Sequence, residues 1–168
     1  MAFALHLLQR LQIHYNPPIA ILPILIGADH PALRIKTKPI AKVTKKISKL
    51  IKDMEETMKV ANGVGLASPQ VGETVRLCLA PINGKLTALI NAQIARSSLE
   101  TTVEEEGCLS LPNTWVPVRR STEIVLTYMD ESGKKQERRV KDFDARVIQH
   151  EVDHLDGILI TDRAEKVS

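Results

Sequence analysis

Two histidines stand four residues apart near the C-terminal end of the chain, in the segment His150-Glu151-Val152-Asp153-His154. Four residues make about one turn of an α-helix, so both imidazoles reach one metal ion only if this segment is helical. Apolar residues recur at helical spacing through the same stretch, at Ala145, Ile148, Val152 and Leu155. We therefore predict a helix over roughly Asp142 to Leu155, with a buried face and metal ligands His150 and His154.

Glu151 lies between the two histidines in sequence and points toward the same cleft without being an obligatory ligand. This placement suits a general base acting on metal-bound water. The pentapeptide alone also fits an ordinary helix, with one histidine hydrogen-bonded in the core and Glu151 solvated. Further ligands are needed to separate these interpretations.

A zincin metalloprotease carries the same pentapeptide but needs another protein ligand downstream. Gly157 matches the metzincin pattern, yet the position of its third histidine is occupied by Ile160, which cannot bind a metal. Glu165 lies too close to the helix end to fold back easily. The third ligand is therefore expected upstream.

Cys108 is the strongest upstream candidate, because a thiolate binds divalent iron or zinc well. Cys78 lies inside an apolar strand pattern and is better interpreted as a small buried hydrophobic residue. Burial remains the alternative for Cys108 as well. Two cysteines in different contexts do not suggest a disulfide framework, which fits a reducing cytosol.

The rest of the chain indicates an α+β fold. A first helix is predicted from the three- and four-residue spacing of Ile40, Val43, Ile47, Leu50, Ile51, Met54 and Met58, with a stop signal at Asn62-Gly63. Between the helices, short β-branched runs predict antiparallel strands, with breaks at Asn83-Gly84, Pro112-Asn113 and Ser132-Gly133. We expect antiparallel β-sheets packed around a central metal-binding helix, with one further N-terminal amphipathic helix.

Length and charge restrict the remaining options. A chain of 168 residues suits one domain, predicted at residues 21–168 behind an N-terminal extension at 1–20. A net charge of +3 is too small for a dedicated nucleic-acid binder, so no DNA partner is expected. Prolines interrupt the most apolar stretch, so no membrane association is expected. The segment Met1 to Ala28 lacks acidic residues, as organellar transit peptides do, but a plain extension or misplaced start is preferred.

Three segments together resemble the peptide deformylase family, in its order and at compatible separations: residues 63–70 (GVGLASPQ), 106–110 (EGCLS) and 149–157 (QHEVDHLDG). The resemblance runs from about Ile21 to Asp162. It implies removal of the formyl group from the N-terminal methionine of nascent polypeptides, with release of formate. Ser68 replaces the family's usual second alanine of the first segment, a change expected to leave activity intact.

The resemblance also implies roles for individual residues. Cys108, His150 and His154 would hold one divalent metal ion, with Fe²⁺ preferred and Zn²⁺, Ni²⁺ or Co²⁺ as alternatives. Glu151 would be the general acid and base, while the Gln70 side chain and the Leu109 N–H would stabilise the oxyanion. Gly63 and Gly65 would let a substrate peptide pair like an added strand, and Val64 is a candidate for the methionine pocket.

The same resemblance implies formyl-methionyl nascent peptides as partners. Separately, we expect a monomer in the bacterial cytoplasm, with organellar import as the alternative. Many bacterial members continue into a basic C-terminal helix that docks on the ribosome, whereas this sequence stops at Ser168. We expect at most a transient ribosome association. A metalloprotease-like hydrolase and a non-catalytic protein with a structural metal are the competing hypotheses; intact Glu151 and Gln70 argue against the second.

Overall fold

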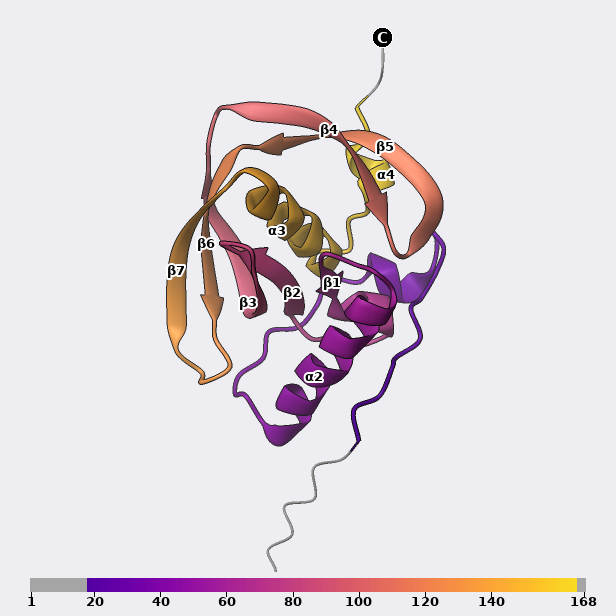
Figure 1. The fold of residues 1–168 in the computed structure, drawn as a ribbon, viewed down its shortest axis with the longest axis vertical. Helices are drawn as coiled ribbons and strands as arrows, with labels where there is room; N and C mark the ends of the chain where they lie inside the picture. Colours follow the sequence, from indigo (N-terminus) through magenta and orange to yellow (C-terminus); the bar gives the residue numbers. More distant parts are fainter. Residues whose placement is uncertain (1–17, 166–168) are drawn as a thin grey trace, which may run out of the picture.

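The computed structural model describes residues 18–165 and places a helix on each face of an antiparallel sheet (Figure 1). Its elements, in chain order, are η1 (Pro31–Arg34), α2 (Lys45–Val60), β1 (Leu66–Ala67), η2 (Ser68–Val71), β2 (Leu77–Ile82), β3 (Lys85–Ser97), β4 (Thr101–Cys108), β5 (Leu111–Ser121), β6 (Glu123–Met129), β7 (Lys135–Lys141), α3 (Asp142–Leu155) and α4 (Ile160–Arg163).

Five strands form the main sheet in the order β1-β2-β3-β6-β7, and every neighbouring pair is antiparallel. Strands β4 and β5 form a separate two-stranded ribbon that arches over α3 (Figure 1). Helix α3 thus lies between the sheet and the ribbon. The predicted α+β class, with antiparallel sheets around a central helix and an amphipathic helix before them, is confirmed.

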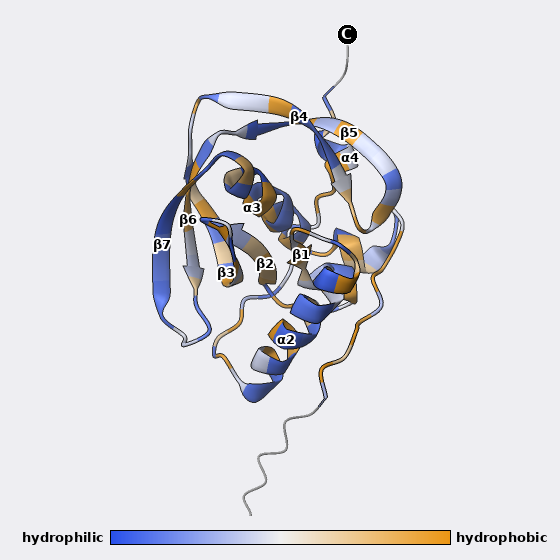
Figure 2. Ribbon diagram, in the orientation of Figure 1, coloured by the Kyte–Doolittle hydropathy of each residue, from blue (hydrophilic) through white to orange (hydrophobic). Residues whose placement is uncertain are grey.

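Strand β2 separates two hydrophobic clusters by the alternation of its side chains. Leu77 and Leu79 join the cluster beneath α2, whereas Cys78 and Ala80 join the cluster beneath α3. Successive side chains of a strand point to opposite faces, so a run that is apolar throughout is buried on both sides. Strand β7 closes one edge of the sheet and is hydrophilic along most of its length (Figure 2), as suits an exposed edge.

Helix α2 begins at Lys45, later than the apolar spacing from Ile40 predicted. The Thr44 hydroxyl caps it by accepting a hydrogen bond from the Ile47 N–H. Ile40 is buried but outside the helix, because the Asn91 side chain binds both its N–H (2.7 Å) and its carbonyl (2.8 Å). Such a long-range partner cannot be predicted from local spacing.

Four of the predicted boundaries agree with the structure. Helix α3 spans Asp142–Leu155, and the breaks at Asn62-Gly63, Asn83-Gly84 and Ser132-Gly133 coincide with turns. The expected break at Pro112-Asn113 is wrong, since both residues lie within β5 and the turn is formed by residues 109 and 110.

Of the predicted N-terminal extension, residues 1–17 lie outside the described part of the chain. Within residues 18–165, no helix combines the length and apolar character needed to cross a bilayer.

Candidate metal centre

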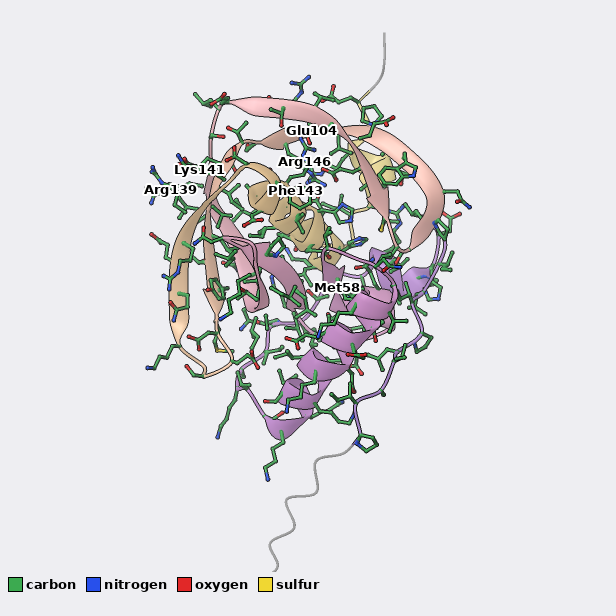
Figure 3. All side chains as sticks on the ribbon, viewed as in Figure 1. Met58, Glu104, Arg139, Lys141, Phe143 and Arg146 are labelled. Carbon is green, nitrogen blue, oxygen red and sulfur yellow. The ribbon has the colours of Figure 1, made fainter. Side chains whose placement is uncertain are left out.

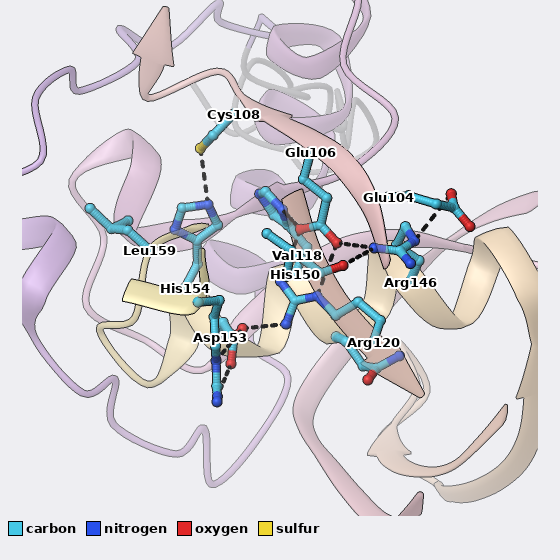
Figure 4. A network of polar contacts seen from close by, with 12 residues as sticks. Glu104, Glu106, Cys108, Val118, Arg120, Arg146, His150, Asp153, His154 and Leu159 are labelled. Carbon is cyan, nitrogen blue, oxygen red and sulfur yellow. Dashed lines mark hydrogen bonds and ion pairs between the residues drawn. The ribbon is translucent and has the colours of Figure 1, made fainter. Parts of the chain in front are cut away.

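The three predicted metal ligands meet where the β4–β5 turn approaches α3. One ligand atom from each of Cys108, His150 and His154 lies within 4.8 Å of the other two. The Cys108 Sγ is 3.2 Å from the His154 Nε2, and the two imidazole ring centroids are 4.9 Å apart (Figure 4). The helical spacing presents both rings on one face of α3, and the final residue of β4 brings the thiol to them.

A buried carboxylate orients one of these rings. The Glu106 Oε2 lies 3.0 Å from the His150 Nδ1, so the Nδ1–H donates to the carboxylate and the Nε2 is left to face the ligand cluster. This is the arrangement by which proteins fix the tautomer of a metal-binding histidine. His154 is almost fully buried, and its Nδ1 has no hydrogen-bond partner within residues 18–165.

The two histidines of the cluster differ in how readily they take up a proton. Burial opposes protonation of His150, but the Cys108 thiol and the Glu106 carboxylate raise its pKa to about 10. Burial lowers the pKa of His154 well below its usual value. A soft thiolate with two imidazoles is a suitable donor set for iron or zinc. The residues present therefore fit a divalent metal.

Glu151 is 4% exposed and stands beside this cluster without belonging to it. Burial raises the pKa of its carboxyl to about 7, and its Oε2 has no hydrogen-bond partner among the described residues. The loop after α2 passes so close that a Cβ on Gly65 would lie 2.4 Å from the Glu151 Oε1. Glycine at this position thus leaves room for the catalytic candidate, a reason the sequence did not reveal.

The Gln70 side chain is held in one orientation by its two ends. Its Oε1 accepts a hydrogen bond from the Ala67 N–H at 2.8 Å. Its Nε2 therefore faces the metal ligands, 3.7 Å from the Cys108 Sγ and 3.2 Å from the Ser110 Oγ. Ser68, the departure from the family pattern, donates its hydroxyl to the Val75 carbonyl, a bond that involves none of these groups.

A cavity of about 470 Å³ opens onto the cluster. Its lining includes nearly every predicted site residue, namely Gly63, Val64, Gly65, Gln70, Cys108, Leu109, His150 and Glu151; His154 is buried behind the lining. Trp115 of β5 and Phe143 of α3 contribute exposed aromatic rings that the sequence did not single out. On the same side, Glu104 and Arg146 face one another between β4 and α3 (Figure 3).

The charged network behind the ligands was not predicted from the sequence either. Arg120 binds Glu106 through two hydrogen bonds of 3.0 Å each and also binds Asp153 (Figure 4). Glu106 lies within one of the three family-like segments, so a carboxylate two residues before the candidate cysteine was the available signal. Nothing in the sequence distinguishes Arg120 from its neighbour Arg119.

The sequence model of the polypeptide deformylase family matches residues 21–168. The chain is 48% identical over 134 residues to the peptide deformylase of Dictyoglomus thermophilum, covering 80% of this chain and 87% of that protein. It is 43% identical over 133 residues to the peptide deformylase of Thermotoga maritima, covering 79% of this chain and 81% of that protein.

Solved structures agree with this similarity. The crystal structure of peptide deformylase from Thermotoga maritima superposes with a TM-score of 0.83 at 41% identity, covering 86% of this chain and 98% of that chain. A class I type b peptide deformylase from Acinetobacter baumannii, crystallised with Met-Ala-Ser bound, gives a TM-score of 0.82 at 30% identity, covering 87% of this chain and 99% of that chain.

Proposed function

This chain belongs to the peptide deformylase family, and we propose that it hydrolyses the formyl amide of N-terminal formyl-methionine in nascent polypeptides. Water adds to the formyl carbon and the C–N bond breaks, which yields formate and a peptide with a free α-amino group. One observation carries the proposal: two histidines of α3, a cysteine from the β4–β5 ribbon and an unligated buried glutamate converge beside one cavity.

We propose that Cys108, His150 and His154 hold one divalent metal ion, with Fe²⁺ as the physiological choice and Zn²⁺, Ni²⁺ or Co²⁺ as alternatives. When bound, such an ion acts as a Lewis acid that polarises a carbonyl and lowers the pKa of coordinated water. Glu106 supports the site by holding His150 through its Nδ1. Three protein ligands leave a coordination position open, which is typical of catalytic rather than structural zinc sites.

Glu151 is proposed as the general base and then the general acid. Its carboxylate takes a proton from the attacking water and passes it to the leaving amine nitrogen. A carboxyl with a pKa near the working pH suits both transfers, and burial brings the pKa of Glu151 to about 7. The unpartnered Oε2 supports this role because no other side chain of the described part competes for it.

Gln70 is proposed as a donor to the oxyanion that develops from the formyl oxygen, together with the Leu109 N–H. The Ala67 N–H fixes the Gln70 carbonyl end, so the side-chain NH₂ already points toward the ligand cluster. Preorganised donors of this kind contribute about 10²–10³ in rate.

Residues 63–65 are proposed to pair with the substrate backbone as an added strand, with Val64 beside the methionine pocket. Val64 is 57% exposed and lines the cavity. The Met-Ala-Ser peptide bound to the Acinetobacter baumannii enzyme has the sequence expected of a deformylated product. A cavity of about 470 Å³ has room for residues beyond the methionine.

We further propose that residues 21–168 form a single catalytic domain, monomeric and cytoplasmic in a bacterium, with 1–20 as an extension. The family match over 21–168 and the bacterial relatives support this assignment.

Iron-loaded protein purified without oxygen and mixed with formyl-Met-Ala-Ser tests the proposal. We expect stoichiometric formate and Met-Ala-Ser, with acetyl-Met-Ala-Ser and internal peptide bonds left intact. Absence of formate, or cleavage within the peptide, would exclude the proposed reaction and favour a protease.

A further inference from the structure

We propose that Arg163, on α4, is a positioning residue for the metal centre: through Asp153, Arg120 and Glu106 it fixes the orientation of His150. The inference rests on the metal site of the proposed function.

The first connection joins α4 to α3. The Arg163 Nη2 donates to the Asp153 Oδ1 at 2.8 Å, and its Nε donates to the Asp153 Oδ2 at 3.2 Å. A guanidinium that grips a carboxylate with two nitrogens fixes its rotation as well as its position. The Asp153 Oδ2 also accepts a hydrogen bond from Arg120, so the two arginines share one carboxylate.

The second connection runs from Arg120 on β5 to Glu106 on β4. The Arg120 Nε donates to the Oε1 of Glu106 and its Nη2 donates to the Oε2, each at 3.0 Å. The Oε2 is the atom that contacts the His150 Nδ1, also at 3.0 Å. Arg146 binds only the Oε1 of Glu106. The carboxylate oxygen that orients His150 is therefore positioned by Arg120.

Burial increases from Arg163 inward to Glu106, and this explains how Arg163, near the surface, influences the orientation of His150. The Arg163 side chain is 47% exposed, whereas Asp153, Arg120 and Glu106 are 11%, 5% and 6% exposed. Charges alternate from one residue to the next. In such a dry network each ion depends on its neighbour for orientation, because water is excluded from the inner members.

Arg119 offers a matched control. It precedes Arg120 on β5, its side chain is 52% exposed, and it binds the Glu165 carboxylate at 2.9 Å, so it also joins β5 to the C-terminal segment. Its other side-chain hydrogen bond among residues 18–165 goes to the Thr101 hydroxyl, outside the network around Glu106. Loss of either arginine removes one partly exposed ion pair. Only Arg163 is connected to His150, through the hydrogen bonds of Asp153, Arg120 and Glu106.

The test uses the full chain as wild type, Arg163→Gln, Arg163→Lys and Arg119→Gln. Cobalt(II) affinity is measured by chelator competition, and the visible absorption spectrum of the bound cobalt reports the ligand geometry. Direct supporting residues of metal ligands typically change affinity 10- to 100-fold. For the more distant Arg163 we expect Arg163→Gln to weaken cobalt binding about tenfold and shift the spectrum, with partial recovery in Arg163→Lys and no change in Arg119→Gln.

Urea unfolding of the metal-free variants separates positioning from general stability. If Arg163→Gln binds cobalt with the affinity and spectrum of Arg119→Gln, the proposal is overturned. If Arg163→Gln does not fold, Arg163→Lys decides: an unchanged spectrum and affinity overturn the proposal, and changed ones support it. Failure of the wild type to bind one metal per chain would instead contradict the proposed function.

Discussion

Glu151 on α3 and Gly65 in the loop after α2 lie in close contact. The Glu151 carboxylate is buried beside the candidate metal ligands, and a Cβ on residue 65 would lie 2.4 Å from its Oε1, so the carboxylate would have to shift to make room for a side chain there. The lack of a side chain at Gly65 thus allows the Glu151 carboxylate on α3 to occupy its position. At the residue scale, the geometry of the site therefore depends on a glycine at position 65 as well as on the polar side chains.

Gly65→Ala is expected to reduce kcat for formate release by about 10²-fold, because displacement of a catalytic group by about 1 Å has an effect of this size. The new Cβ would lie 2.4 Å from the Glu151 Oε1 and push the carboxylate aside. Metal content, measured in parallel, should stay at the wild-type value. If Gly65→Ala keeps the wild-type kcat, catalysis does not depend on the exact position of the Glu151 carboxylate.

The pentapeptide 150–154 indicated two candidate ligands and a candidate general base, and Cys108 became the upstream candidate ligand once Ile160 was excluded. His150, Glu151 and His154 could be found because α3 obeys a local helical period. Glu106, Arg120 and Arg163 could not, because their contacts depend on the β4–β5 register and on the return of α4 to α3. These contacts join residues far apart in sequence, which local patterns do not encode.

At the scale of the elements, Arg120 of β5 connects Glu106 on β4 to Asp153 on α3. This guanidinium is 5% exposed, lies between Glu106 and Asp153, and joins the β4–β5 ribbon to α3. Removing one partner of a buried ion pair leaves an uncompensated charge in a dry environment.

Arg120→Ala is therefore expected to lower the free energy of unfolding by about 3–5 kcal/mol, measured by urea denaturation of the metal-free protein. Arg119→Ala, which removes an exposed pair on the same strand, should change it by no more than about 1 kcal/mol. Similar values for the two variants would show that the Arg120 pair is effectively solvated.

The segment before η1 is joined to α2 by Asp53. Its Oδ1 accepts a hydrogen bond from the Ala20 N–H at 2.9 Å, and its Oδ2 binds the Lys49 ammonium at 2.6 Å. Burial opposes ionisation of Asp53, but the bonds from Lys49 and Ala20 lower its pKa below the usual 3.8.

A lowered pKa means that the ionised carboxylate stabilises the fold above about pH 4, and that this contribution is lost as the pH falls through the pKa of the folded state. Asp53→Asn should destabilise the protein by about 1–2 kcal/mol at pH 7, and the difference from wild type should shrink as the pH is lowered from about 5 to about 3. A difference that stays constant over this range would contradict the role given to the charge.

At the scale of the whole molecule, the fold places α3 between the main sheet and the β4–β5 ribbon, so that candidate ligands from the helix and from the ribbon meet. The helix period and the short strands predicted this arrangement, and α3 was predicted to its end residues. The start of α2 and the turn near Pro112 were not, because Asn91 holds Ile40 outside the helix and β5 continues through Pro112. The elements are encoded locally, whereas their junctions are set by tertiary contacts.

We propose that Cys108, His150 and His154 hold the metal while Glu151, beside them, transfers the proton. The most direct test measures metal content and formate release from formyl-Met-Ala-Ser together, in iron-loaded wild type and Glu151→Gln. We predict one metal per chain in both proteins and at least about a 10²-fold loss of kcat in the variant. Retention of formate release by Glu151→Gln, or loss of its metal, would contradict the account.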